Sequence, residues 1–174
     1  MPLQSTVNVL LNVGVIGDIL LDEPYRVQPV TLDNNGGTLG NFFTKSNSTG
    51  IATQGGTITN GSVVFGGIAV NSKIEPLFGS SATNPLAANE TLQPNSQVAL
   101  MTMGSCLVSI GNAFNIGDLV SYNTTTGAIT SYAPGGSPPG GSVQMPNAVV
   151  YGVPSQGGLA NSAAAGLAIV RLTN

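Results

Sequence analysis

Short apolar and β-branched runs, separated by clusters of Gly, Asn and Pro, recur along the whole chain, and no long stretch has the periodicity of a helix. This pattern is typical of short strands joined by turns, as in β-sandwiches, jelly rolls and barrels. The chain has 174 residues, enough for one domain that buries roughly 70% of the surface of its unfolded chain. We therefore predict an all-β fold: a single-domain, jelly-roll-like sandwich or barrel.

We divide the chain at residue 33. Residues 1–33 are predicted to form an extended N-terminal arm with one or two short strands, because Pro24 and Pro29 cannot donate hydrogen bonds to a full ladder. Residues 34–174 are predicted to form the β-sandwich or barrel body, which the alternating segment "GLAIVRLTN" closes. The most buried stretch should be "VALMTMGSCLVSI", two strands hinged near Gly104, because both of its alternating faces are apolar.

Two long loops interrupt the predicted body. The segment from Pro76 to Gln97 is longer than most loops in compact domains, so we expect a functional loop or a short helix near residues 86–90. The segment from Pro134 to Ser142, "PGGSPPGGS", is too rich in Gly and Pro for a ladder and is predicted to be a flexible, solvent-exposed loop. The segment "SVVFGGIAVNSKIE" should form a further strand or pair of strands, bent or bulged at the Gly66-Gly67 pair.

Two nearly identical pentapeptides, "IGDIL" at residues 16–20 and "IGDLV" at residues 116–120, each place Gly-Asp before two aliphatic residues. Gly adopts positive φ without penalty and Asp bonds its own backbone, so each pentapeptide predicts a turn that starts a strand. The flanking residues differ, which favours two convergent turns over a duplicated domain. The second turn should start a hairpin over residues 117–133, with Val120 and Tyr122 on one face and a turn that closes at Gly127.

Charged residues make up 6% of the chain, where about 25% is usual. Because 41% of the residues are hydrophobic, the chain should nevertheless fold rather than remain disordered. The net charge is −3 with only four cationic residues, too few to form the basic stripe that nucleic acid requires. No apolar run is long enough to span a membrane, and the N-terminus lacks the positive region of a signal peptide. We expect neither nucleic acid nor a membrane as a partner.

The sequence contains no His, which removes the commonest general base and the imidazole metal ligands. Acidic residues gather in the arm: Asp18, Asp22, Glu23 and Asp33. We interpret them as solvated turn residues balanced by Arg26, because their spacing matches no EF-hand calcium loop. The lone Cys106 lies in the apolar segment "MGSCLVSI" and is predicted to be buried and structural. We therefore predict no catalytic activity, no cofactor and no metal site.

Four segments follow one another in a characteristic order: the arm "VNVLLNVGVIGDILLDEPYRV", the central "GTLGNFFTKSNSTGIATQG" with a later "GGIAVNSKIE", the hairpin "FNIGDLVSYNTTTGAITSYA", and the short closing strand. In this succession, which covers most of the chain, the sequence resembles the structural cement or head-decoration proteins of tailed bacteriophages. The Pro76 to Gln97 segment and the Pro134 to Ser142 tip depart from the pattern of that family.

The resemblance implies a structural protein that binds the outer surface of a bacteriophage head and stabilises contacts between major capsid proteins. It implies that the partners are the major capsid protein and neighbouring copies of the chain, in a homo-oligomer that is a dimer or a trimer. The protein would be made in the cytoplasm of the host bacterium and would reside on the virion. The alternative is a tail-fibre, spike or surface adhesion module that recognises a host receptor, because such modules are also β folds rich in Asn, Thr and Gly.

We expect the capsid contact to lie in the arm, because as an isolated segment it lacks a closed hydrophobic face and would become ordered along a neighbour. The candidate contact residues are aliphatic anchors with polar neighbours: Val13, Val15, Ile16, Asp18, Ile19, Leu20, Tyr25 and Arg26. The competing interpretation is that the arm packs on its own body as a first strand. In that case we expect the contact to lie elsewhere, in the Pro76 to Gln97 loop.

Overall fold

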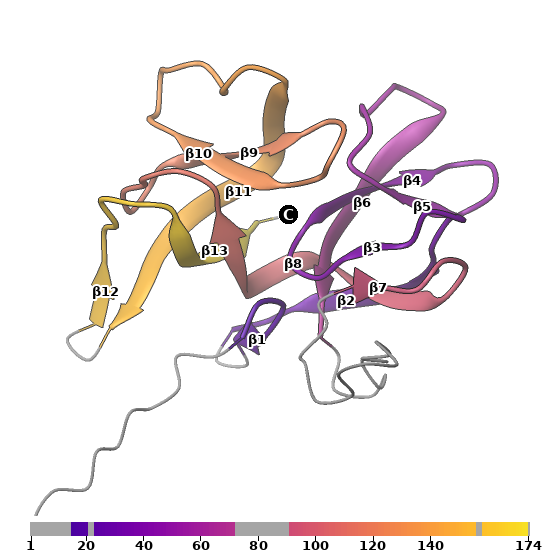
Figure 1. The fold of residues 1–174 in the computed structure, drawn as a ribbon, viewed down its shortest axis with the longest axis horizontal. Coiled ribbons are helices and arrows are strands. Elements are labelled where there is room, and N and C mark those ends of the chain that lie inside the picture. Colours follow the sequence, from indigo (N-terminus) through magenta and orange to yellow (C-terminus); the bar gives the residue numbers. More distant parts are fainter. Residues whose placement is uncertain (1–14, 21–22, 72–90, 156–157, 174) are drawn as a thin grey trace, which may run out of the picture.

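The computed structural model describes residues 15–20, 23–71, 91–155 and 158–173, which form strands and loops (Figure 1). None of these described residues lies in a helix. The strands are, in chain order, β1 (Ile19–Leu20), β2 (Arg26–Thr31), β3 (Gly37–Thr38), β4 (Phe42–Ser46), β5 (Ala52–Gln54), β6 (Val63–Val70), β7 (Thr91–Leu92), β8 (Gln97–Ile110), β9 (Leu119–Asn123), β10 (Ile129–Tyr132), β11 (Ser142–Ser155), β12 (Gly158–Ala160) and β13 (Gly166–Leu172). The prediction of an all-β fold is confirmed.

The main sheet folds into two lobes that share strand β8 (Figure 1). In the first lobe, the first half of β8 lies between β2 and β6, and β4 and β5 follow β6. In the second lobe, the second half of β8 pairs with β13, and β11, β9 and β10 follow. A parallel contact closes each lobe, from Leu32 to Ala52 in the first and from Ile110 to Ile129 in the second. The molecule therefore consists of two small barrels built on one common strand, within the predicted sandwich or barrel class.

Strand β8 changes partners at Gly104. Residues 97–103 pair with β2, and the residues from Gly104 to Ile110 pair with β13. Gly104 has a φ of +115°, and a Cβ at this position would lie 2.6 Å from the Cβ of Tyr25. Only glycine fits so close an approach. The sequence predicted two strands hinged here, whereas the structure has a single strand of 14 residues that switches partner at the predicted hinge.

Two predictions of local structure are confirmed by the strand pairing. The register between β4 and β6 shifts around Gly66, because Phe43 pairs with Gly67 whereas Thr44 pairs with Phe65. Strands β9 and β10 form the predicted hairpin. Its inward-facing residues are buried and lie opposite one another: Val120 with Ser131, and Tyr122 with Ile129.

Two hydrophobic clusters fill the lobes. The interior of the first lobe holds Val30, Leu32, Leu39, Phe43, Ala52, Ala69, Leu92, Val98 and Leu100. The larger cluster fills the second lobe and continues between the lobes, where Phe42 of β4 meets Tyr122 of β9 with ring centroids 3.8 Å apart. Because apolar packing runs continuously across the shared strand, the two lobes form one folding unit.

The two lobes also repeat one backbone pattern. Residues 39–54 align with residues 116–131 without a gap, and equivalent positions make equivalent hydrogen bonds. Three pairs of N–H to carbonyl bonds match between the lobes. The N–H of Gly40 bonds Ala69 (2.8 Å) as that of Gly117 bonds Val150 (2.8 Å), and the N–H of Asp33 bonds Ala52 (2.9 Å) as that of Gly111 bonds Ile129 (3.0 Å). The N–H of Gly50 bonds Ser46 (2.9 Å) as that of Gly127 bonds Asn123 (2.8 Å). The chain therefore contains an internal structural duplication.

This duplication does not relate the two Gly-Asp turns to each other. Both turns do start strands as predicted, since β1 begins at Ile19 and β9 begins at Leu119. The duplicated unit, however, equates Gly117 with Gly40, which lies in "TLGN", and not with Gly17, which lies in "IGDIL". The two Gly-Asp turns do make the same local hydrogen bonds, since Gly17 and Asp18 bond Leu107 as Gly117 and Asp118 bond Val150. Strands of different length follow them, in keeping with two convergent turns.

Candidate interaction surface

The described part of the arm lies along β8 in two short strands. In β1, Ile19 pairs with Cys106, and β2 pairs antiparallel with residues 97–103. Pro29 faces Ala99 in this ladder, which is tolerated because β2 is hydrogen-bonded along its length to β8 alone and Pro can occupy an edge strand. The second of the two interpretations of the arm therefore holds for residues 19–20 and 26–31, which pack on their own body.

Three of the predicted contact residues are accessible. Val15 is 53% exposed, Tyr25 is 48% exposed, and Arg26 is exposed as well. Val15 and Tyr25 flank the β1 segment, so they present apolar surface near the shared strand β8. These residues can contact a partner without any change in the body.

The other predicted contact residues are engaged within the chain or fall outside the described residues. Ile16 packs against the core of the first lobe, and Ile19 packs against the larger cluster. Leu20 is half-buried, and the Oδ2 atom of Asp18 accepts a hydrogen bond from the N–H of Val15 at 3.0 Å. Val13 lies outside the described residues. The predicted group therefore divides into residues that hold the arm in place and residues that face outward.

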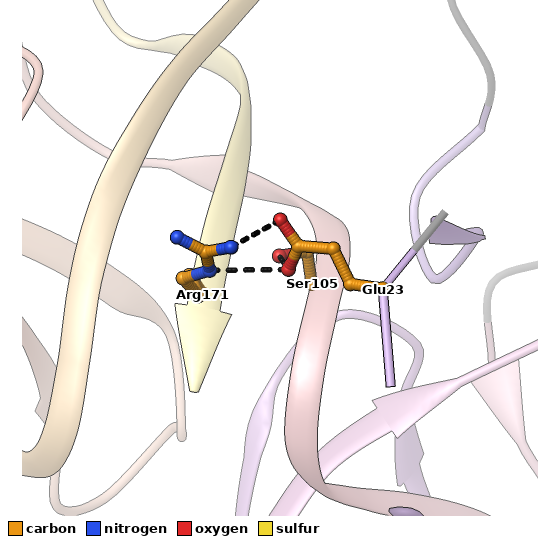
Figure 2. Close-up of polar contacts among 3 residues, drawn as sticks. All are labelled: Glu23, Ser105 and Arg171. Carbon is orange, nitrogen blue, oxygen red and sulfur yellow. Dashed lines mark hydrogen bonds and ion pairs between the residues drawn. The ribbon is translucent and has the colours of Figure 1, made fainter. Parts of the chain in front are cut away.

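A polar cluster fastens the arm beside these outward-facing residues (Figure 2). The Ser105 hydroxyl donates to Oε2 of Glu23 at 2.8 Å, and Nε of Arg171 donates to the same oxygen at 3.1 Å. A second guanidinium nitrogen of Arg171 pairs with Oε1 of Glu23, and the guanidinium lies over the Tyr151 ring, 4.7 Å from its centroid. The hydrogen bond from Ser105 and the contacts with Arg171 lower the pKa of Glu23, although burial opposes them. We call Glu23, Ser105 and Arg171 the arm clasp.

The arm clasp replaces the predicted pairing of the acids with Arg26. Among the described residues, the ion-pair partner of Glu23 is Arg171, which lies 148 positions away at the other end of the chain. The guanidinium binds the carboxylate through two nitrogens, which is the strong, orientation-specific form of this contact. Glu23 is thereby fixed to β8 and β13, and the neighbouring Tyr25 is held at the surface.

Cys106 is buried as predicted, and its thiol is unpaired. Burial raises its pKa to about 12, so the thiol stays protonated at neutral pH and lacks the thiolate that a nucleophile needs. Within the described residues, no three side chains of His, Cys, Asp or Glu are grouped so that they could hold a metal ion.

A pocket between the lobes is lined by Phe65, Thr102, Pro146, Asn147, Leu172 and Thr173. The described residues that line it carry no acid, base or thiol. In the described part of the chain no helix is long and apolar enough to cross a membrane.

Comparison with known proteins gives the fold a context. No curated protein matches the chain by sequence. Among solved structures, a chain from "The capsid of Myoviridae Phage XM1" matches with a TM-score of 0.62 and 15% identity, over 98% of this chain and 98% of that one. At this identity the likeness establishes the fold alone. A family model described as "Structural cement protein (E217 gp24/Pam3 gp6)" matches residues 3–173. Because that match spans nearly the whole sequence, the chain belongs to the phage structural cement protein family.

Proposed function

We propose that this protein binds the outer surface of a bacteriophage head and holds neighbouring major capsid proteins together. The observation that carries the proposal is the family match over residues 3–173, since that family is a structural one. The cement role needs no active site, in keeping with a chain that lacks His. The comparisons give no support to a tail-fibre or adhesion module.

The exposed side chains of the arm are the proposed contact with the shell. Val15 and Tyr25 supply apolar surface and Arg26 supplies a charge, a combination that is common in the centre of protein interfaces. The arm clasp supports this assignment, because it fixes Glu23, two residues before Tyr25, to strands β8 and β13. A contact that is already ordered loses little conformational entropy on binding.

Neighbouring copies are proposed to associate on the shell as dimers or trimers. A net charge of only −3 supports dense packing, because repulsion between like copies falls as their net charge falls. Synthesis in the reducing cytoplasm of a bacterial host is compatible with a single buried cysteine.

The proposal is tested with purified phage heads that lack the protein. The wild-type chain should bind these heads, measured by cosedimentation, and should raise the temperature at which they break open. The double variant Val15→Asp/Tyr25→Asp should bind roughly tenfold or more weakly, because it places charges in the contact. Ile116→Asp is the matched control, since Ile116 is 48% exposed but lies on the second lobe.

Thermal unfolding should be similar for the wild type and both variants. If the wild type fails to bind the heads, the cement role on the outer surface is wrong. If the wild type binds and the double variant binds equally well, the contact is not on the arm.

A further inference from the structure

The hairpin turn of the second lobe docks on the first lobe, and its bonds show how such a turn can be bound. We call residues 124–127 the second tip. The Thr124 carbonyl oxygen accepts a hydrogen bond from the N–H of Gly56 (2.7 Å), and the Gly127 carbonyl oxygen accepts one from the N–H of Phe42 (2.9 Å). The Thr126 carbonyl oxygen accepts hydrogen bonds from Nδ2 of Asn41 (3.3 Å) and from Nε2 of Gln54 (2.5 Å). The second tip is therefore recognised through its backbone carbonyls.

A glycine kink on the first lobe makes room for this contact. Gly55 and Gly56 both have positive φ, +71° and +84°, directly after β5. A Cβ on Gly55 would lie 2.7 Å from the carbonyl oxygen of Thr124, and a Cβ on Gly127 would lie 2.5 Å from that of Phe42. Both surfaces must therefore lack side chains where they meet.

The internal duplication places an equivalent turn, residues 47–50, on the first lobe. We call it the first tip. Its backbone bonds match those of the second tip, and so do its side-chain bonds. In the first tip the Thr49 N–H donates to Ser46 Oγ (3.4 Å), as in the second tip the Thr126 N–H donates to Asn123 Oδ1 (3.0 Å). Likewise the Ile51 N–H donates to Thr49 Oγ1 (3.4 Å), as the Ala128 N–H donates to Thr126 Oγ1 (3.3 Å). The first tip already has the conformation that the second tip has when bound.

The first tip has no corresponding partner among the described residues. None of these residues donates a hydrogen bond to the carbonyl oxygens of Asn47, Thr49 or Gly50, the positions equivalent to the three bound carbonyls. A Cβ on Gly50 would meet nothing within 4 Å, whereas Gly127 is enclosed. Ile51, at the end of this tip, is 39% exposed.

We propose that the first tip is a second docking element, which binds the shell protein as the second tip binds the first lobe. The occupant would present a strand edge followed by a glycine kink, with backbone N–H groups and an amide side chain as donors. The shell protein as partner rests on the proposed function. The chain would then hold the shell at two places, at the arm and at the first tip.

A second copy of the chain does not offer this binding surface. The surface on its first lobe is already filled by its own second tip. On its second lobe the positions equivalent to Gly55 and Gly56 are Tyr132, in β10, and Ala133, so the glycine kink is missing. The proposed occupant is therefore the shell protein rather than a second copy.

Substitution of Gly50 tests the proposal on the full chain with heads that lack the protein. Gly50 has a φ of +72°, and Asn tolerates positive φ better than other residues with side chains, so Gly50→Asn should fold. Its side chain should nevertheless block docking, and binding to the heads should weaken roughly tenfold or more. The matched control is Ser48→Asn, because its counterpart Thr125 stays exposed in the bound second tip. Ser48→Asn should bind like the wild type.

Hydrogen exchange on the wild-type chain gives a second readout that needs no variant. The amide of Gly50 should exchange more slowly on the heads than in solution, because its counterpart Gly127 is buried in the bound second tip. Wild-type binding by Gly50→Asn, or unchanged exchange at the tip, would overturn the proposal. So would a loss of self-association in Gly50→Asn without a loss of head binding, because the occupant would then be a second copy. Failure of the wild type to bind would remove the shell as partner together with the proposed function.

Discussion

Tyr122 places a hydroxyl in the core without a hydrogen-bond partner among the described residues. Burial raises the pKa of Tyr122, and a backbone contact with Ile58 lowers it in part. An unpaired buried hydroxyl costs about 1–3 kcal/mol. Tyr122→Phe keeps the ring against Phe42 and removes that cost, so the free energy of unfolding should stay the same or rise.

Urea unfolding of the wild type and Tyr122→Phe measures this difference. Tyr122→Leu is the control, since it removes the ring as well and should destabilise the protein. A loss of stability of more than about 1 kcal/mol in Tyr122→Phe would mean that the hydroxyl is satisfied in solution, for example by a buried water.

Single residues were predictable where their environment is set by neighbours in sequence. The alternation of "GDLVSYN" placed Val120 and Tyr122 on one buried face, and the apolar surroundings of Cys106 predicted its burial; both are confirmed. The arm clasp was not predictable, because Glu23 and Arg171 are 148 positions apart and only the pairing of β13 with β8 brings them together. Because the chain has only four cationic residues, Arg26, which is the nearest to Glu23 in sequence, was predicted to balance it, and this prediction is wrong.

At the scale of elements, the two equivalent turns differ in what surrounds their glycines. Gly50 and Gly127 have nearly the same φ, +72° and +67°, so an alanine at either position costs about 1–2 kcal/mol of backbone strain. A Cβ on Gly127 would additionally lie 2.5 Å from the Phe42 carbonyl oxygen, whereas a Cβ on Gly50 would meet nothing within 4 Å. Gly127→Ala should therefore destabilise the protein by about 1–3 kcal/mol more than Gly50→Ala.

The difference in melting temperature between these two variants measures the contact between the lobes, since the strain common to both cancels. Equal melting temperatures would show that the second tip does not press on the first lobe. The comparison is independent of shell binding and needs only the purified protein.

The elements were predictable from local signals, but their duplication was not. Over residues 39–54 and 116–131, identical residues occur only at Gly40 and Gly117, Thr49 and Thr126, Gly50 and Gly127, and Thr53 and Thr130. These are turn and strand residues that recur throughout such a chain, so they carry little information about register. The more similar "IGDIL" and "IGDLV" share a turn but not the strands that follow it.

For the whole molecule, the sequence predicted a barrel or sandwich but not a strand that serves two barrels. An apolar run as long as "VALMTMGSCLVSI" with a central glycine is compatible with two strands or with one, because burial on both faces is the same in either case. The choice depends on partners that approach from distant segments: β2 and β6 on the first half of β8, and β13 on the second. Residues 72–90, which include most of the predicted Pro76 to Gln97 loop and its alternative short helix, lie outside the described residues.

The shared strand gives the last prediction, which concerns truncation. Deleting residues 1–14 leaves every described strand intact, so the shortened chain should fold and melt close to the wild type, as followed by far-UV circular dichroism. Deleting residues 1–30 removes β1, the Glu23 side of the arm clasp and nearly all of β2. It would uncover the edge of β8 and the buried Val98 and Leu100, and it would weaken the closure of the first lobe at Leu32.

The longer truncation should therefore fail to fold, because an open barrel with an exposed apolar edge cannot offset the entropy of ordering the chain. A deletion of residues 1–30 that melts cooperatively near the wild-type temperature would show that β2 is dispensable and that the arm is a separate element after all. If the deletion of residues 1–14 folds but binds phage heads less well than the wild type, the shell contact extends beyond Val15 toward the N-terminus and includes the region of Val13. Unchanged binding would restrict the arm contact to the described residues around Val15, Tyr25 and Arg26, which the arm clasp holds against the body.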